Sequence, residues 1–443
     1  MNFETWWLIF VPLLFALGWI AARVDIRQML SETRTLPKSY FKGLNFLLNE
    51  QPDRAIDAFV EVAKLDPETT ELHFALGSLF RRRGEMERAI RVHQSLLARA
   101  DLPVADREHA QHELAQDYLK AGMLDRAEQA FELVLDTRFA VPAVRSLIRI
   151  YESEHDWDRA IQAVRRLRAL VDEPVPQLVH YQCEQATAAL AGKNPDLDKA
   201  SAALDAAGKA FGELNDTVQS QASRARVAIV RARLAALQGN PELQLTFLAS
   251  VLDQAPDYAG LVAADLMACY QRAGQPEEGL QVLLTHYQRH PALDVFNVVF
   301  REMRIQFGYD PAWAFARQAL RLHPSLLGLD RLLEAEIASR KQGAEDAPVA
   351  AVAPAATRTE VTAHAAAAVP GSAAPHIINA SGFTQETPVA DLGLLRTLIH
   401  KHTLRLDRYS CRVCGFEARH FYWQCPGCNS WETYQPRRLE ELS

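Results

Sequence analysis

Two Cys-x-x-Cys pairs near the C-terminus are the residues best suited to chemistry in this chain. The first pair is Cys411 and Cys414, and the second is Cys425 and Cys428. Two cysteines at this spacing can bind one metal ion from a single tight turn, so two such turns predict a tetrahedral site of four thiolates. A site in which the protein supplies all four ligands is structural and leaves no position open for a substrate.

The residues around the four cysteines indicate whether they bind a metal ion and which one. The residues after each pair, Gly415 and Asn429, tolerate the positive φ that such a turn needs. We expect one zinc ion, with iron chemically open in the same site, because nothing else suggests electron transfer. Two disulfides or a redox dithiol are the alternatives, but a redox dithiol usually occurs as a single pair within a βαβ pattern, which is absent from the sequence here. Structural zinc contributes about 10–16 kcal/mol in small peptides, enough to fold a short module.

The sequence contains no complete catalytic motif. His112 and Glu113 begin a stretch that resembles the zinc-protease helix, but Gln116 stands where the second histidine is required. The sequence also lacks a phosphate-binding loop, a dinucleotide-binding glycine pattern and a nucleophile elbow. We therefore expect a protein that is not an enzyme. A metal-dependent redox or hydrolytic protein that uses the four-cysteine centre is the alternative.

Composition excludes further classes. The chain has 443 residues, which suggests two or three domains, and a net charge of −7, which gives no general affinity for nucleic acid. A cluster near the C-terminus does mix basic and aromatic residues, so a nucleic-acid-binding ribbon is a second alternative, although such aromatic residues more often form a small core. Its members are Arg412, Arg419, His420, Phe421, Tyr422, Trp423 and Trp431. The other cysteines, Cys183 and Cys269, fall in apolar helical segments, so no disulfide framework is expected and a reducing compartment is favoured.

The chain begins with an apolar segment, Trp6 to Ala22, that has the character of a membrane anchor. It is uncharged, its length is at the lower limit for a membrane span, and tryptophans lie near both ends. A cleaved signal peptide needs positive charge ahead of the apolar run, but the only charged side chain there is Glu4. Basic residues follow the segment instead. We therefore expect a single-pass anchor over residues 1–22, with the bulk of the chain on the cytoplasmic side.

Residues 36–340 are expected to form a helical repeat array. Small and large apolar residues recur about every 34 residues, the period of tetratricopeptide repeats. Four units keep this phase as far as Glu173, which argues against an ordinary Ala-rich bundle, and the pattern then weakens over units near 177–212, 225–256, 260–291 and 294–324. The positions matched in the first two units are Gly43 and Gly77, Phe46 and Phe80, and Ala55 and Ala89.

Stacked repeats of this kind offer an extended concave surface for binding. Arginines and histidines at the outward positions of the first helices predict a locally basic groove that suits an acidic or amphipathic peptide. Taken one at a time, these residues are as simply explained by a solvated helix face. The predicted partner-binding residues are Phe74, Arg81, His109, His112, Gln116, Arg145 and Arg149, and Tyr40 and Glu152 belong to the same surface.

The Ala- and Pro-rich residues 341–388 are expected to be a flexible linker. After it, residues 389–443 form the metal-binding module. Leucines at helical spacing between Leu392 and Ile399 predict one short helix ahead of the cysteines, whose apolar face is expected to dock the module onto the array.

The order of these parts resembles the lipopolysaccharide assembly protein B family of Gram-negative bacteria. The resemblance rests on the anchor, the phased repeats and the four cysteines with Gly415, Pro426 and Trp431. It implies an all-α fold, a tetratricopeptide-repeat superhelix with an N-terminal transmembrane helix and a small C-terminal rubredoxin-like zinc ribbon. The loop between the cysteine pairs is shorter than in true rubredoxins, which argues against an electron carrier, and the linker is longer than in compact members.

The resemblance also implies a non-enzymatic regulator at the cell inner membrane. Such proteins present the deacetylase of the lipid A pathway to a membrane-anchored AAA+ metalloprotease of the FtsH type, and so balance lipopolysaccharide against phospholipid. Other lipopolysaccharide assembly proteins are implied as partners, no nucleic acid is expected, and a homo-oligomer is left open. Cys411, Cys414, Cys425 and Cys428 carry over as the metal ligands, whereas no peptide-contact residue carries over.

Overall fold

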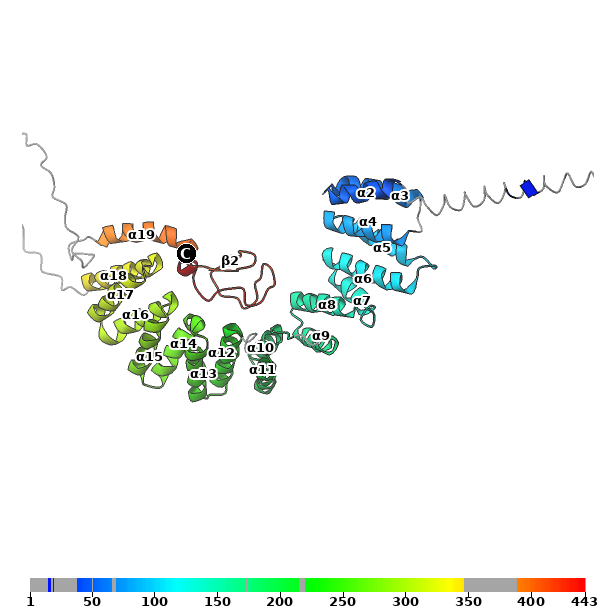
Figure 1. Cartoon of the computed structure of the whole chain (residues 1–443). Coiled ribbons are helices and arrows are strands. Elements are labelled where there is room, and N and C mark those ends of the chain that lie inside the picture. Colours follow the sequence, from blue (N-terminus) through cyan, green and yellow to red (C-terminus); the bar gives the residue numbers. More distant parts are fainter. Residues whose placement is uncertain are drawn as a thin grey trace, which may run out of the picture. The chain divides into compact units, whose positions relative to one another are not determined.

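A computed structural model divides the chain into two compact units of packed helices, Met1–Glu173 (unit 1) and Pro174–Ser443 (unit 2) (Figure 1). The structure describes residues 15, 16, 19, 38–49, 51–65, 69–171, 174–214, 220–345 and 389–442.

Unit 1 is built from helix pairs joined by short turns, and each pair packs on the next. The helices are α2 (Lys38–Leu48) with α3 (Pro52–Leu65), α4 (Thr70–Arg83) with α5 (Met86–Leu97), α6 (Val104–Lys120) with α7 (Leu124–Glu132), and α8 (Ala140–Glu154) with α9 (Trp157–Leu170). The chain reverses after α4 and α6 at glycines in the left-handed region, Gly84 (φ 87°) and Gly122 (φ 73°). Glycine adopts this conformation without a Cβ clash, so it ends one helix and starts the turn to the next.

The repeating residues form the core between the paired helices. Ala55, Phe59, Ala89 and Phe131 are all completely buried. A side chain at Gly43 would come within 2.7 Å of the Phe59 ring, which shows why this repeat position is small. The predicted repeat pattern is therefore the packing pattern of the helices.

Gly77 gives a test of this packing. A Cβ added there would overlap the imidazole of His93, which is completely buried and has little room to move. Gly77→Ala is expected to destabilise the protein by about 1–3 kcal/mol in urea unfolding, because the core becomes overpacked. The matched change Gly212→Ala places its Cβ in open space and is expected to be neutral or stabilising. Equal stability of the two variants would contradict this account.

Unit 2 continues the same arrangement, and the helix pairs predicted beyond Glu173 are present. The pairs are α10 (Gln177–Ala189) with α11 (Leu197–Gly212), α12 (Gln221–Leu237) with α13 (Pro241–Gln254), α14 (Ala259–Arg272) with α15 (Pro276–Arg289), α16 (Leu293–Phe307) with α17 (Tyr309–Leu322), and α18 (Leu326–Glu345) with α19 (Val389–Leu406). A single 3₁₀ turn, η2 (Pro256–Tyr258), precedes α14.

The chain ends in a small module that we call the ribbon, residues 407–442. It holds a two-residue antiparallel pair, β1 (Tyr409–Ser410) with β2 (Glu417–Ala418), and a final 3₁₀ turn, η3 (Leu439–Leu442). In Figure 1 the ribbon lies beside the helices of unit 2. The predicted all-α repeat fold with a four-cysteine module is confirmed for the described residues.

Two predicted segments fall largely outside the described residues. The anchor over residues 1–22 is described only at Phe15, Ala16 and Trp19, and in the described part of the chain no helix has both the length and the apolar character needed to cross a bilayer. α18 extends to Glu345 and so includes the first residues predicted as linker, while residues 346–388 are not described.

α19 is longer than the short helix that its leucines predict, and it packs differently. Of the predicted leucines Leu392 is buried, whereas Leu394, Leu395 and Leu398 are exposed. Asp330 of α18 joins the two helices, because it pairs with Arg396 of α19 and accepts a hydrogen bond from Nδ1 of His400 at 3.0 Å. Most of the leucines predicted to dock the ribbon are therefore exposed. Leu406 at the end of α19 packs on the core of unit 2, as do Phe421 and Trp423 of the ribbon.

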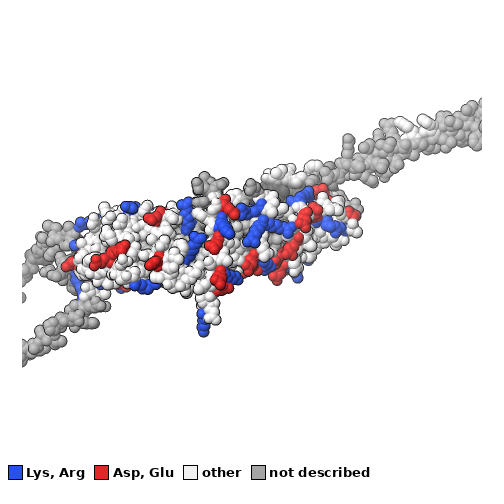
Figure 2. Space-filling model, turned by 90° about the horizontal axis from the view of Figure 1, so that it is seen from below, with Lys and Arg blue, Asp and Glu red and all other residues white. Residues whose placement is uncertain are grey.

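Surface charge agrees with the composition. On the face shown in Figure 2, Lys and Arg are interspersed with Asp and Glu over the described residues. Mixed charge of this kind favours solubility and gives no continuous basic stripe on that face for nucleic acid to follow.

Candidate metal centre and its seat on the repeats

The structure brings the four predicted cysteine ligands together. Their sulfur atoms all lie within 4.8 Å of one another, with Cys411 and Cys428 3.8 Å apart and Cys414 and Cys425 3.6 Å apart. Four sulfurs at about 2.3 Å from one zinc ion stand about 3.8 Å apart, so the donor set fits a tetrahedral metal. These separations are far longer than a disulfide bond. Together the cysteines can hold one metal ion.

The two turns have the same local geometry. Gly415 (φ 72°) and Asn429 (φ 55°) take the positive φ expected after each pair. The amide N–H of Val413 points to the sulfur of Cys411 at 3.4 Å, and that of Gly427 to the sulfur of Cys425 at 3.3 Å. Donors aimed at the sulfurs stabilise thiolates, so each turn is prepared for a cation. Among the described residues these cysteines are the one group of three or more side chains placed to share a metal.

The ribbon binds unit 2 at a polar cluster that we call the seat, in which Glu432 of the ribbon contacts Ser220, Ser223 and His180. The carboxylate of Glu432 accepts hydrogen bonds from Ser220 Oγ at 2.6 Å, Ser223 Oγ at 2.7 Å and His180 Nε2 at 2.7 Å. These residues belong to α10 and to the start of α12. Burial opposes the charged form of Glu432, but the hydrogen bonds outweigh it and lower the pKa of the carboxyl to about 2. The seat therefore holds an ionised carboxylate.

Arg226 of α12 fixes His180 behind this contact. Its Nη1 donates to Nδ1 of His180 at 3.1 Å, and its Nη2 donates to Glu184 at 2.5 Å. Burial lowers the pKa of His180, which keeps the ring neutral. With Nδ1 accepting, Nε2 carries the proton and donates it to Glu432. The buried arginine is thus balanced by two carboxylates, Glu184 directly and Glu432 through the imidazole.

Two tryptophans of the ribbon cover this polar cluster. Trp431 stacks on His180 with ring centres 4.9 Å apart, and Trp423 stacks on Tyr258 at 5.6 Å. The guanidinium of Arg226 lies over both indoles, at 5.1 Å from Trp431 and 5.5 Å from Trp423. Cation–π contacts at desolvated sites contribute up to about 2 kcal/mol. The two tryptophans therefore bind the repeats, whereas the core of the ribbon is built on the other aromatic residues beside the cysteines.

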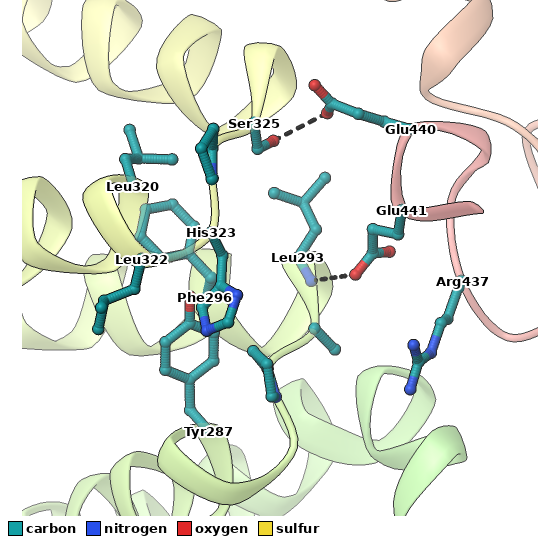
Figure 3. A pocket seen from close by; sticks show the side chains of 13 residues that line it. Tyr287, Leu293, Phe296, Leu320, Leu322, His323, Ser325, Arg437, Glu440 and Glu441 are labelled. Carbon is teal, nitrogen blue, oxygen red and sulfur yellow. Dashed lines mark hydrogen bonds between the residues drawn. The ribbon is translucent and has the colours of Figure 1, made fainter. Parts of the chain in front are cut away.

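The C-terminal tail makes a second attachment (Figure 3). Glu441 accepts the amide N–H of Leu293 at 2.8 Å at the start of α16. Glu440 accepts from Ser325 Oγ at 2.8 Å, just before α18, and from the first two amides of that helix. The first N–H groups of a helix lack partners within the helix and favour a negative charge. The same residues border a pocket of about 340 Å³. The tail therefore caps two helices of the array.

The sequence predicted neither the seat around Glu432 nor the attachment of the C-terminal tail. The residues missed are His180, Ser220, Ser223, Arg226, Glu432, Glu440 and Glu441. The sequence alone does not single out Arg226, because α12 carries three other arginines; its burial, which requires a partner, is seen only in the structure. The identity of that partner lies far along the chain: His180 and Glu432 are 252 residues apart.

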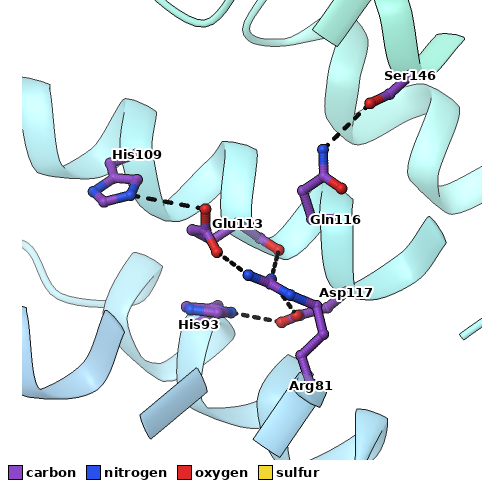
Figure 4. Close-up of polar contacts among 7 residues, drawn as sticks. All are labelled: Arg81, His93, His109, Glu113, Gln116, Asp117 and Ser146. Carbon is purple, nitrogen blue, oxygen red and sulfur yellow. Dashed lines mark hydrogen bonds and ion pairs between the residues drawn. The ribbon is translucent and has the colours of Figure 1, made fainter. Parts of the chain in front are cut away.

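In unit 1, part of the predicted partner-binding surface is a polar network (Figure 4). Arg81 of α4 pairs with Glu113 and, at 2.7 Å, with Asp117, which also accepts from His93 Nδ1 at 2.5 Å. Gln116 of α6 donates to Ser146 Oγ of α8 at 3.2 Å. Arg81 and Gln116 therefore join successive first helices.

The two predicted histidines pack against aromatic rings. His109 stacks on Phe74 with ring centres 4.0 Å apart, and His112 stacks on Phe139 at 4.7 Å. Burial lowers the pKa of both histidines, so both are neutral at pH 7.

The remaining predicted residues lie on two other first helices. Arg145 and Arg149 are exposed on α8, Glu152 is half-buried on the same helix, and Tyr40 lies in α2. Since Arg81 is paired and the histidines are neutral, Arg149 supplies exposed positive charge at this surface.

Comparisons with known proteins agree with both parts of the fold. The family model described as a rubredoxin metal binding domain matches residues 409–436, and the tetratricopeptide repeat model matches residues 42–101. Lipopolysaccharide assembly protein B of Escherichia coli (strain K12) is 28% identical over 431 residues, which cover 97% of either chain. The protein of the same name from Haemophilus influenzae is 25% identical over 442 residues, covering 97% of this chain and 98% of the relative.

Among solved structures, similar chains include a tetratricopeptide repeat protein from Parabacteroides merdae (12% identity, TM-score 0.28, covering 67% of this chain and 98% of that one) and MamA (19% identity, TM-score 0.29, covering 39% and 95%). The similarity to lipopolysaccharide assembly protein B extends over nearly the whole chain and includes both the repeats and the metal-binding module. The predicted resemblance to the lipopolysaccharide assembly protein B family is therefore confirmed.

Proposed function

We propose that this protein is a non-enzymatic adaptor in lipopolysaccharide assembly. The observation that carries the proposal is the match over 97% of the chain to relatives named for that process. The architecture supports a binding role, because stacked helix pairs present extended surfaces to other proteins. The four-cysteine centre is used structurally in this proposal, since each ligand comes from the protein.

The proposed partners are the deacetylase of the lipid A pathway, as client, and a membrane-anchored protease of the FtsH type, together with other lipopolysaccharide assembly proteins. An anchor over residues 1–22 would confine the adaptor to the inner membrane beside the protease, with the repeats in the cytoplasm. Confinement raises the effective concentration of two bound proteins, so weak contacts suffice for transfer.

The client site is assigned to the first helices of unit 1. In unit 2 the ribbon covers part of the first helices α10 and α12, where His180, Ser223 and Arg226 contact it. In unit 1, α4, α6 and α8 present the Phe74 and His109 stack and the exposed Arg149. An amphipathic segment with an acidic residue matches these side chains in both polarity and charge.

A charge reversal tests the client site. Arg149→Glu is expected to reduce the deacetylase recovered with the membrane-bound protein at least about tenfold, because a like charge opposite a client carboxylate costs more than about 1.4 kcal/mol. The matched control is Arg165→Glu, an exposed arginine of the second helix α9. Recovery should be unchanged in the control. Equal recovery from both variants would move the client away from this surface.

We also propose that the resident metal is zinc. A closed site of four thiolates suits zinc, which here would fix the two turns and supply no reaction. The ribbon's own residues position the sulfurs, bury Cys411 and Cys425, and attach the ribbon to the array.

A further inference from the structure

We propose that unit 2 carries a second binding site, on α11, α12 and α13, for an acidic peptide segment that also bears an aromatic or aliphatic side chain. The site is an open pocket of about 740 Å³, and none of its lining residues belongs to the ribbon. It lies on a different unit from the proposed client site, so it goes beyond the proposed function.

The charge of the pocket is strongly positive for a chain whose net charge is −7. Lys209, Arg224 and Arg231 line it, against one acidic residue, Asp205. A cavity lined by one sign of charge concentrates ligands of the opposite sign. The pocket therefore favours carboxylates or other anions.

The arginines are held in place by aromatic rings and by the backbone. The guanidinium of Arg224 lies 5.6 Å from the centre of the Phe211 ring, and that of Arg231 lies 6.0 Å from Phe247. Arg231 also donates from Nη2 to the carbonyl of Leu204 at 3.4 Å. A guanidinium held over a ring loses less freedom when it binds a carboxylate.

Gly208 makes room for this arrangement. A Cβ at this position would lie 2.8 Å from Nη2 of Arg231, so any larger residue would push the guanidinium aside. Glycine in the interior of α11 weakens the helix relative to alanine. Its presence is explained by the room that the missing Cβ leaves for the guanidinium of Arg231.

The same pocket offers apolar surface beside the charges. Phe211, Val227 and Phe247 contribute to its lining. Its border is open to solvent, since Asp205, Lys209 and Gln254 are exposed. Small-molecule sites usually enclose most of their ligand, whereas an open pocket with neighbouring cationic and apolar surface suits a peptide laid across it. A free inorganic anion would use the charges and leave the rings uncovered.

The test uses the full-length protein in detergent micelles and two dye-labelled peptides, Gly-Asp-Phe-Glu-Leu-Asp-Gly and its neutral counterpart Gly-Asn-Phe-Gln-Leu-Asn-Gly, followed by fluorescence anisotropy. The acidic peptide is expected to bind more tightly, with an affinity that falls as salt is added. Arg231→Gln should weaken this binding about tenfold, as expected for the loss of one charge-assisted hydrogen bond. The control Arg233→Gln changes an exposed arginine of the same helix outside the pocket and should leave binding unchanged.

Two further variants separate binding from folding. Lys209→Gln changes an exposed residue, and it should weaken the acidic peptide severalfold while the unfolding midpoint stays the same. Gly208→Ala should keep or raise the midpoint, because alanine favours the helix, and yet weaken binding by displacing Arg231. Equal binding of the acidic and neutral peptides, or equal affinity of the Arg231 and Arg233 variants, would overturn the proposal. Competition by millimolar inorganic phosphate as strong as that by the unlabelled peptide would overturn the peptide assignment in favour of a small-anion site.

Discussion

Replacing Cys425 by serine is expected to unfold the ribbon and release it from the repeats. Cys425 is completely buried and supplies one of the four sulfurs of the proposed zinc site. Structural zinc contributes about 10–16 kcal/mol in small peptides, which is comparable to the whole stability of a typical domain of about 5–15 kcal/mol. A ribbon with two-residue strands has little else to hold it together.

The loss of the metal should be visible in two measurements on the purified full-length protein. Zinc per chain is expected to fall from one to nearly zero, and hydrogen exchange over residues 409–436 should become fast. Cys269→Ala is the matched control, because it removes a buried thiol outside the cluster and should leave the metal content at one. A Cys425→Ser protein that keeps a folded, metal-free ribbon would refute the site assignment. A coloured iron centre with reversible redox chemistry would instead favour the alternative of a redox protein.

Replacing Glu432 by alanine is expected to detach the ribbon while leaving its metal in place. The change leaves His180, Ser220 and Ser223 without the carboxylate that all three contact. Removing one partner of a buried charged network costs about 3–5 kcal/mol, mostly because the groups left behind stay buried and unpartnered. The zinc ligands do not contact Glu432 directly, so the metal content should not change.

The measurement is hydrogen exchange of α10 and the first turn of α12, which should increase in the Glu432→Ala protein. Glu417→Ala is the control on the same ribbon, because Glu417 pairs with Arg405 and Arg408, whose side chains are 77% and 39% exposed. Exposed pairs of this kind contribute less than about 1 kcal/mol, so this variant should keep the seat protected. Protection that stays the same in both variants would mean that the ribbon is held by the aromatic stack and the tail alone.

The parts of the fold that follow local spacing could be predicted from the sequence. The small residues Gly43 and Gly77 pack against the following helix as the repeat period requires. The spacing of Cys411 and Cys414, repeated at Cys425 and Cys428, placed the four sulfurs together because each turn is set by its own few residues. In both cases the interacting residues lie close together in the chain.

The seat of the ribbon could not be predicted, because its contacts join residues far apart in sequence. Nothing in the sequence distinguishes Glu432 from other acidic residues. Its contacts with His180 and Ser223 exist only once the repeats have folded. The partner-binding surface was also predicted incompletely, because helical spacing does not show the contacts between neighbouring helix pairs. Helical spacing placed His112 on the outward face, but the neighbouring pair contributes Phe139, which stacks on it and buries it. A helix period identifies a face and does not show what the next helix places against it.

In the proposed function this protein holds two other proteins together at the membrane and transforms neither. The most direct test is a two-step purification from membranes in mild detergent, with one affinity tag on the full-length protein and a second on the deacetylase. We expect the protease to be recovered after both steps with the wild-type protein and to be lost from the second eluate with the Arg149→Glu variant. Recovery of the deacetylase and the protease only in separate complexes, or a three-protein complex that is unchanged by Arg149→Glu, would contradict the proposed function.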